Sequence, residues 1–439
     1  MEYSSIQLND LPDEIIFIIL KKLNKLDVLY SLMDVNKRLN YIVHDPTFTN
    51  GLTLFNNLSC DCICPLPDLM LDRFCSQILP KIGHKIKWLD LEPFSMERIL
   101  STNYPNLFGL ELHVKVMYIQ DCLYLLDGRF NQLQIFRVEI GLSSSHSILI
   151  INKEKLPNLR CFSLSCHSDV NFYDTVLIPL LYRMSNLEQL SLYLSCVHHN
   201  RFINGNDLKE NIIDYLPQLN QFQFNIRSTM LLKNQIDLPS NEDIQYTFKD
   251  FLNNEIISCV NYFPEYNEGI CLIYSYPYTL RYYENIANNF PGGLFTCVYD
   301  VSLYDEHPFE HEFFIRIQKS FPFMERLTIM NRKAQNDKQC EKLKNTNQDL
   351  LVIEYSHLKR LILNEAHDDY VEQFLLDTKT CLPYGLDLHI DYKPLKRVTY
   401  NFKRHVTRIN CSKIRYICSD TNLRFPKHFK DYFLDIDVS

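Results

Sequence analysis

A short pattern of hydrophobic and polar positions, L-x-x-L-x-L, recurs along most of this 439-residue chain, for example in PNLRCFSLSC, SNLEQLSLYL and SHLKRLILNE. Alternating apolar positions of this kind predict short β-strands with one buried side. The first inward residues of these strands are expected to be Leu89, Leu110, Phe136, Phe162, Leu190 and Phe222, and then Ile273, Val301, Leu327, Leu361, Leu388 and Tyr416. Most of them are 26 to 28 residues apart, a spacing typical of repeat proteins.

Segments with helical periodicity separate these strands. Apolar residues at positions i, i+3 and i+4 predict helices at 95–100, 119–126, 175–184, 280–288, 309–319, 370–378 and 395–403. A strand followed by a helix cannot bury its apolar side alone, so neighbouring units should stack into a right-handed α/β solenoid with the strands on its concave side. This arrangement resembles a leucine-rich-repeat horseshoe. It is an irregular one, because the period is lost between Ile226 and Gly269 and a polar insertion occupies 331–349.

The N-terminal segment has a different pattern, which predicts three short helices. Asp10 and Pro12 are suited to the start of the first helix, as its N-cap and first turn. That helix is apolar on every side up to Leu23, so it needs cover all round. Asp27 is expected to cap the second helix. A module of about 40 residues cannot supply all this cover, so the remaining apolar side predicts a partner.

Residues Leu8 to Phe48 resemble the F-box. The resemblance rests on Leu11-Pro12-Asp13-Glu14, the Ile/Leu-rich first helix, Asp27-Val28-Leu29 and the Asp45-Pro46-x-Phe48 ending, while Asn36 and Leu39 replace the Cys and Trp common in the family. It implies a surface for the Skp adaptor of a Skp–cullin–F-box ubiquitin ligase, at or next to Leu11, Pro12, Ile15, Ile19, Leu23, Leu29 and Val35. Alternatively, these side chains are only the core of a three-helix cap on the solenoid.

Composition narrows the classes of partner. The net charge is −8 and no long Lys/Arg run occurs, so nucleic acid and anionic membranes are not expected to bind. The N-terminus lacks a signal-peptide pattern, and no stretch of 18 apolar residues is present. The 15 cysteines have no disulfide-like or close regular spacing, and Gly-rich phosphate loops are absent. We therefore expect a cytoplasmic or nuclear protein with reduced thiols and no cofactor.

The strand pattern also predicts where a substrate would bind. Side chains alternate along a strand, so the residues between and after the inward pair should face the concave surface. The candidates for binding a protein substrate are Glu111, His113, Arg137, Glu139, Tyr193, Gln223, Asn225, Tyr304, Thr328 and Asn364, with Ser163, Ser165, Ser191 and Ser302 in the same rows. The alternative is a solvated sheet face that binds nothing.

Two motifs invite a metal-site interpretation. His307, Glu310 and His311 have the H-x-x-E-H spacing of one class of zinc peptidases, but Pro308 places His307 at the start of a helix, with Glu310 in its first turn. Cys60, Cys62 and Cys64, with Cys75 and His84 downstream, lack the wider spacing that zinc frameworks favour. Neither is expected to bind a metal, and no catalytic residue is assigned.

The sequence thus predicts an F-box at 6–50, a helical, Cys-containing connector at 51–84, a leucine-rich-repeat-like solenoid at 85–420 and a tail at 421–439. The expected function is that of the substrate receptor of a Skp–cullin–F-box ligase, bound to the Skp adaptor and the cullin-RING core and holding an unknown protein substrate. Such a receptor is not an enzyme. The alternatives are an interaction scaffold outside any ligase and, less favoured, a zinc hydrolase at His307, Glu310 and His311.

Overall fold

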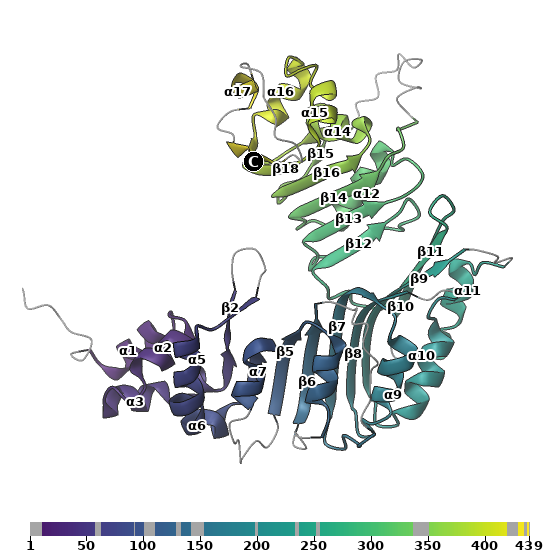
Figure 1. Cartoon of the computed structure of the whole chain (residues 1–439). Helices are drawn as coiled ribbons and strands as arrows, with labels where there is room; N and C mark the ends of the chain where they lie inside the picture. The colour runs from purple at the N-terminus through teal and green to yellow at the C-terminus, as the bar shows by residue number, and fades with distance from the viewer. Residues whose placement is uncertain are drawn as a thin grey trace, which may run out of the picture. The chain divides into compact units, whose positions relative to one another are not determined.

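The chain divides into two units, which we describe separately (Figure 1). The computed structural model describes residues 11–57, 63–91, 93–100, 110–128, 133–141, 153–197, 201–232, 237–251, 255–336, 351–418, 429–433 and 437–438. Unit 1 contains Met1–Val260 and Ile270–Ser275, and unit 2 contains Asn261–Gly269 and Tyr276–Ser439.

Unit 1 begins with four short helices, and side-chain caps fix the starts of the second, third and fourth. They are α1 (Asp13–Leu20), α2 (Lys25–Leu32), α3 (Lys37–Val43) and α4 (Pro46–Thr49). The side chains of Asn24, Asn36 and Asp45 each accept a backbone N–H of the following turn at 2.8 Å. The expectation that Asp27 caps the second helix is wrong, because Asn24 begins that helix three residues earlier. Asn36, at a position where the F-box family often has Cys, caps α3.

The helices that follow cover part of this N-terminal bundle. They are α5 (Asp68–Arg73), the π-helix η2 (Phe74–Ile78), α6 (Leu79–Ile82) and the 3-10 helix η3 (Gly83–Lys85). The ring of Phe74 stacks on the ring of Tyr30 in α2, with 6.4 Å between the ring centres, and the guanidinium of Arg73 lies 4.8 Å from the centre of the Tyr30 ring. Lys81 forms an ion pair with Asp34. The connector therefore supplies cover for α2 from within the chain.

A nine-stranded sheet forms the rest of unit 1. Its order is β1 (Gly51–Thr53), β4 (Trp88–Leu91), β5 (Leu110–Val116), β6 (Leu133–Ile140), β7 (Cys161–Val170), β8 (Gln189–Val197), β9 (Gln221–Leu231), β11 (Glu268–Ser275) and β10 (Ile256–Phe263). The strands from β1 to β9 are parallel, and from β4 to β9 the predicted inward residues Leu89, Phe136, Phe162, Leu190 and Phe222 lie in one row. In β5 the row contains Leu112 rather than the predicted Leu110, because the register pairs Leu89 with Leu112 and Leu112 with Phe136. A separate hairpin pairs β2 (Phe55–Asn57) with β3 (Ile63–Pro65).

The parallel series of unit 1 ends at β9. The hydroxyl of Ser275 accepts the backbone N–H of Phe224 at 3.0 Å, and the hydroxyl of Ser228 donates to the Cys271 carbonyl at 3.5 Å. Residue numbers therefore rise along β9 while they fall along β11, so the two strands are antiparallel. Ile273 lies on this antiparallel strand and does not begin a second parallel series, contrary to the prediction. This reversal explains why the repeat period is lost here.

Unit 2 contains a second sheet, whose described strands follow chain order. They are β12 (Tyr282–Ile286), β13 (Asp300–Tyr304), β14 (Arg326–Asn331), β16 (Arg360–Ala366), β18 (Leu386–His389), β19 (Ile414–Cys418) and β20 (Asp437–Val438), all parallel to their neighbours. The predicted helix at 280–288 is wrong, since β12 occupies it. Val301, Leu327, Leu361 and Leu388 share one row, but Ile417 continues it in place of Tyr416 because a register irregularity precedes Asp387.

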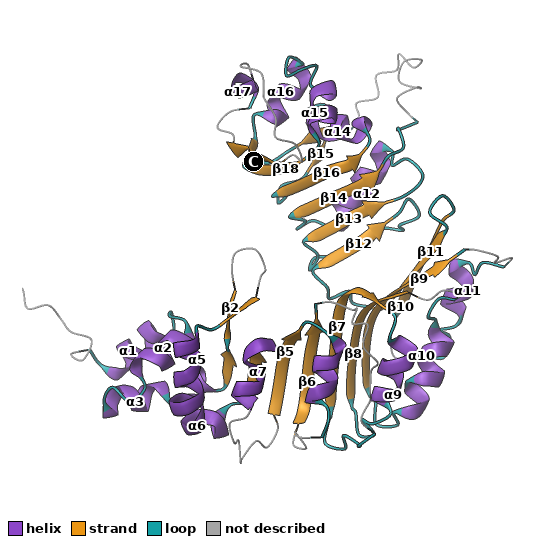
Figure 2. Cartoon of the chain, viewed as in Figure 1, coloured by secondary structure: helices purple, strands orange, loops and turns teal. Residues whose placement is uncertain are grey.

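Helices lie along one side of each sheet (Figure 2). In unit 1 they are α7 (Pro93–Leu100), α8 (Ile119–Leu125), η4 (Tyr173–Leu177), α9 (Ile178–Leu181), α10 (Gly205–Asn211), η5 (Ile213–Tyr215) and α11 (Asn241–Tyr246). In unit 2 they are α12 (His311–Ser320), α14 (Asp368–Leu375), α15 (Tyr392–Val398), α16 (His405–Cys411) and α17 (Phe429–Tyr432), beside the short pair β15 (Ile353–Glu354) and β17 (Thr380–Cys381). Within the described ranges, no helix combines the length and the hydrophobicity that crossing a bilayer requires.

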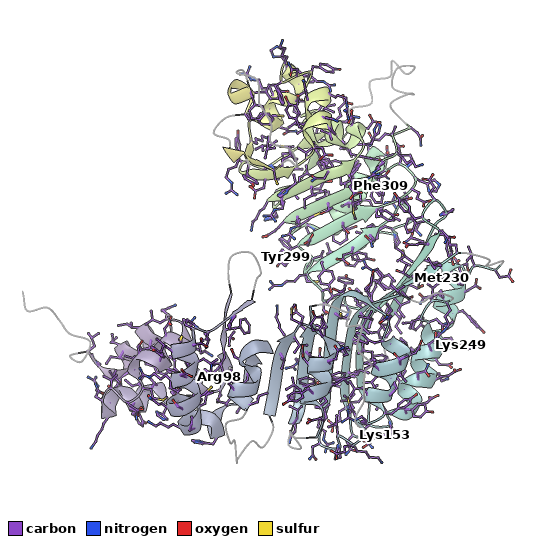
Figure 3. All side chains as sticks on the ribbon, viewed as in Figure 1. Arg98, Lys153, Met230, Lys249, Tyr299 and Phe309 are labelled. Carbon is purple, nitrogen blue, oxygen red and sulfur yellow. The ribbon has the colours of Figure 1, made fainter. Side chains whose placement is uncertain are left out.

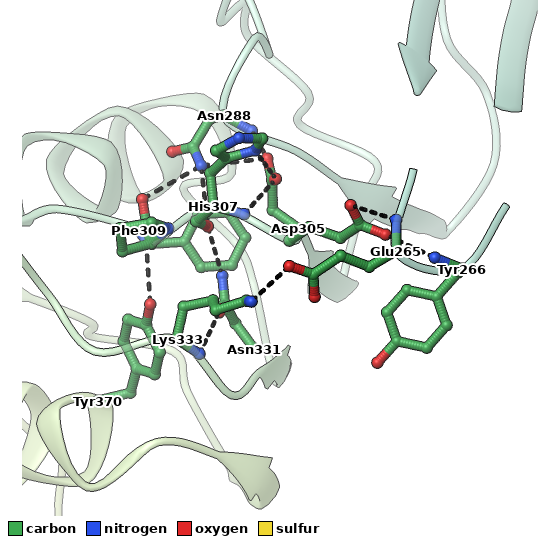
Figure 4. A network of polar contacts seen from close by, with 11 residues as sticks. Glu265, Tyr266, Asn288, Asp305, His307, Phe309, Asn331, Lys333 and Tyr370 are labelled. Atoms are coloured by element: carbon green, nitrogen blue, oxygen red, sulfur yellow. Dashed lines mark hydrogen bonds and ion pairs between the residues drawn. The ribbon is translucent and has the colours of Figure 1, made fainter. Parts of the chain in front are cut away.

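A buried carboxylate holds the turn between β10 and β11. Glu306, only 8% exposed, accepts the backbone N–H groups of Glu265 and Tyr266 at 3.0 and 2.9 Å. Nearby, Lys333 forms an ion pair with the Glu265 side chain at 2.6 Å, and Asn331 donates to the His307 carbonyl at 2.7 Å (Figure 4). The polar loop predicted at 331–349 therefore begins later than expected, because Asn331 belongs to β14.

Replacing Glu306 by Ala is expected to lower the free energy of unfolding by about 1–3 kcal/mol, because two buried N–H groups lose their acceptor. Urea denaturation measures the change. Glu265→Ala is the matched control, since it removes only a solvent-exposed ion pair with Lys333 and should change the stability much less. Equal effects of the two substitutions would contradict the role given to Glu306.

Candidate functional site

Helix α1 has an exposed apolar face. Ile16 and Leu20 are buried at 0% and 2% exposure. In contrast, Ile15, Ile18 and Ile19 are 43%, 56% and 40% exposed. These three lie at i, i+3 and i+4, and therefore on one side of the helix. We call this set, together with Leu23 at 53% exposure, the apolar stripe.

The other residues predicted to bind the adaptor have mixed positions. Val35 is 58% exposed, Pro12 is exposed and Leu11 is half-buried. Leu29 is fully buried, so it belongs to the core of the helical bundle and cannot contact a partner. Sequence reasoning did not assign Ile18 to this surface, although the same helical spacing from Ile15 would have found it.

Arg38 fixes the start of α1. Its guanidinium donates to the Leu11 carbonyl and forms an ion pair with the Asp13 carboxylate. These contacts join Leu11 and the first turn of α1 to α3, on which Arg38 lies. The contacts of Arg38 therefore attach the start of α1, the helix that carries most of the apolar stripe, to α3.

A pocket of about 590 Å³ opens beside the stripe. Ile18 contributes to both, and the other lining residues are Asp13, Glu14, Phe17, Tyr41, Ile42, His44, Asp45, Pro46 and Lys85. Hydrogen bonds from the Thr47 side chain and backbone hold the pKa of the Asp45 carboxyl below its ordinary value, so this group stays charged at neutral pH. The lining combines apolar side chains with three carboxylates and Lys85, and it includes Tyr41, 82% exposed, which sequence reasoning did not assign to this surface.

The sheet of unit 1 brings most of its predicted substrate-binding residues into two rows. Register places Arg137, Ser163, Ser191 and Gln223 on adjacent strands, and likewise Glu139, Ser165, Tyr193 and Asn225. Lys115 extends the second row through an ion pair with Glu139 at 3.2 Å. Glu111 and His113 are in β5, but their side chains lie outside the described residues.

The sheet of unit 2 places Tyr304, Thr328 and Asn364 on the side opposite its buried leucines. Tyr304 packs against Phe263 at 4.8 Å and Tyr266 at 5.7 Å, and burial raises the pKa of its hydroxyl. Tyr304 therefore packs against other aromatic rings of unit 2, in addition to lying on the face predicted to bind substrate.

Sequence reasoning missed a second row on the exposed side of this sheet. Asp300, Arg326, Arg360 and Asp387 occupy equivalent positions on β13, β14, β16 and β18. Each directly precedes the first inward residue of its strand, whereas the predicted residues all follow it. The same alternation, extended one step toward the strand start, would have found them.

The structure does not arrange His307, Glu310 and His311 as the helical ligand set that the zinc-site alternative requires. Helix α12 begins at His311, so His307 is outside the helix, with its side chain 78% exposed beside Asp305. Both ring nitrogens of His311 have partners, Nδ1 at 3.2 Å from the Gln373 amide oxygen and Nε2 at 2.9 Å from the Leu351 carbonyl. No group of three His, Cys, Asp or Glu side chains in the described part of the chain is arranged to hold a metal. Cys60, Cys62 and the Cys64 side chain lie outside that part.

Comparison with known proteins bears on the N-terminal bundle. Residues 8–50, which include α1 to α4 and the apolar stripe, match the F-box domain family. The chain carries an F-box. F-box domains are in general the Skp-binding modules of Skp–cullin–F-box ligases, and F-box proteins are typically non-catalytic adaptors. No curated protein matches the chain.

Proposed function

We propose that this F-box protein is the substrate receptor of a Skp–cullin–F-box ubiquitin ligase. The apolar stripe on α1 supports this proposal most directly, because it is an exposed apolar face on a domain that in general binds the Skp adaptor. Burying its four side chains would contribute about 1.5–3 kcal/mol each before ordering costs. That is enough for a stable helical interface.

The sheets would hold the substrate in this proposal. Parallel strands in chain order, separated by helices on one side, are consistent with an irregular leucine-rich-repeat-like solenoid. Its exposed strand faces carry the mixed hydroxyl, amide and charged rows described above, a chemistry suited to protein recognition. The receptor makes no bond itself and acts by raising the local concentration of substrate near the ubiquitin-loaded enzyme.

Co-expression with the Skp adaptor and a cullin tests this function. The expected result is a stoichiometric complex in which the cullin is retained only when the adaptor is present. An adaptor complex that never retains a cullin would instead favour the interaction scaffold outside any ligase. Failure to bind the adaptor at all would overturn the proposal.

A further inference from the structure

Four charged residues, Asp300, Arg326, Arg360 and Asp387, form a row on the sheet of unit 2. We call it the charged row, and not all of its members form ion pairs. Arg326 donates to the Asp300 carboxylate at 2.9 Å, on the strand away from Arg360. Asp387 lies directly across from Arg360, yet its carboxylate accepts from Arg415 at 2.8 Å. Both acidic residues of the row therefore have another arginine as their partner.

The side chain of Arg360 is left without a partner. The backbone N–H of Arg360 donates to the Glu325 carbonyl at 2.9 Å, but Arg360 is the only arginine in the described part of the chain whose side chain has no hydrogen bond, ion pair or ring contact. Register places it directly across from Arg326, whose charge is already matched by Asp300. Of Arg326, Arg360 and Arg415, only Arg360 forms no ion pair, while the charges of Arg360 and Glu284 also act on the Asp300 carboxylate.

The surroundings of Arg360 are partly dehydrated. Burial raises the pKa of the Asp300 carboxyl, against the opposing effect of Arg326. Burial, followed by the positive charge of Arg360, lowers the pKa of the His389 imidazole, so this ring is neutral at pH 7. Charge interactions are stronger in such a place than in bulk water. The neighbouring row adds the hydroxyls of Ser302 and Thr328 on the same face.

We propose that Arg360 binds an anionic group, a carboxylate or a phosphate, on a protein ligand of this sheet face. The planar guanidinium can donate two parallel N–H bonds to either group, and Arg326 and Thr328 flank the position. That the ligand is the substrate of a ligase rests on the proposed function. The anion site itself rests only on the charged row.

Three pools of immobilised peptides test the site. Each has random flanks around a fixed central phosphoserine, glutamate or serine, and retention of the purified full-length chain is measured with and without the Skp adaptor. We expect one or both anionic pools to retain the wild type at least tenfold more than the serine pool. Retention by the phosphoserine pool alone identifies phosphate as the ligand group, and retention by both identifies any carboxylate or phosphate.

Arg360→Gln should reduce this retention at least tenfold. Lys359→Gln is the matched control, because it removes the same charge from the adjacent residue, whose side chain is 70% exposed and paired with Glu325 at 2.7 Å. It should leave retention unchanged. Equal retention by all three pools, no effect of Arg360→Gln, or equal effects of the two substitutions would overturn the anion site. Adaptor binding, followed in the same samples, reports on the proposed function separately.

Discussion

The double substitution Ile15→Asp, Ile19→Asp is expected to weaken binding of the Skp adaptor at least about a thousandfold, equivalent to about 4 kcal/mol. Each change removes an aliphatic side chain from the apolar stripe and places a carboxylate where the interface would exclude water. Both residues are already about two-fifths exposed in the chain alone, at 43% and 40%. The substitutions should therefore change its melting temperature little, and isothermal titration calorimetry with the adaptor measures the affinity.

A matched control comes from another helix with an exposed aliphatic pair. Val406 and Ile409 of α16 are 45% and 54% exposed and lie one turn apart. Val406→Asp, Ile409→Asp makes the same chemical change outside the F-box and should leave the affinity unaltered. Wild-type affinity in the Ile15, Ile19 variant would show that the stripe is not the adaptor surface. A parallel loss in the control would point to a general effect of added charge.

The N-terminal bundle shows how far sequence patterns reach. The all-round apolar character of α1 was visible in the sequence, and so was the need for cover. The periodicity of α1 did not show which of its sides stays exposed, because that depends on residues distant in the sequence such as Phe48, whose ring packs on Phe17 of α1 at 5.5 Å. The resemblance to the F-box placed Leu29 at or next to the adaptor surface. Its spacing resembles that of the stripe, and only the packed structure shows that it is fully buried.

The inward residues of the strands could be predicted wherever apolar and polar side chains alternate and neighbouring strands keep the same register. Phe136, Phe162 and Leu190 fall into the predicted row because their strands pair in continuous register from Cys161 to Cys166, before the shift that follows Cys166. Prediction fails where the register differs from the repeat phrase: Leu112 lies opposite Leu89 in place of Leu110, and a register irregularity puts Ile417 in place of Tyr416. It fails again where a hairpin turns the chain back, since an antiparallel strand has the same alternation as a parallel one. The charge balance around Arg360 could not be predicted, because Asp387 could pair with either neighbouring arginine.

The largest loss of stability is expected at the aromatic core of unit 2. Phe314 is fully buried, with ring centres of Phe309, Phe313, Tyr370 and Phe374 between 5.5 and 6.2 Å away. Phe309, labelled in Figure 3, also donates its backbone N–H to the Tyr370 hydroxyl at 3.0 Å. Phe314→Ala would leave a cavity inside this cluster and should lower the free energy of unfolding by about 3–5 kcal/mol in urea denaturation.

Phe323 provides the comparison, because it is 42% exposed and has a ring contact with His357 at 5.5 Å. Phe323→Ala should cost less than about 1 kcal/mol, and a cost equal to that of Phe314→Ala would contradict the assignment of the core. The F-box belongs to the other unit, and its own core contains Ile16, Leu20 and Leu29. The Phe314→Ala chain should therefore keep its affinity for the adaptor while its second unit unfolds at lower urea. Loss of both together would mean that the two units fold as one cooperative body.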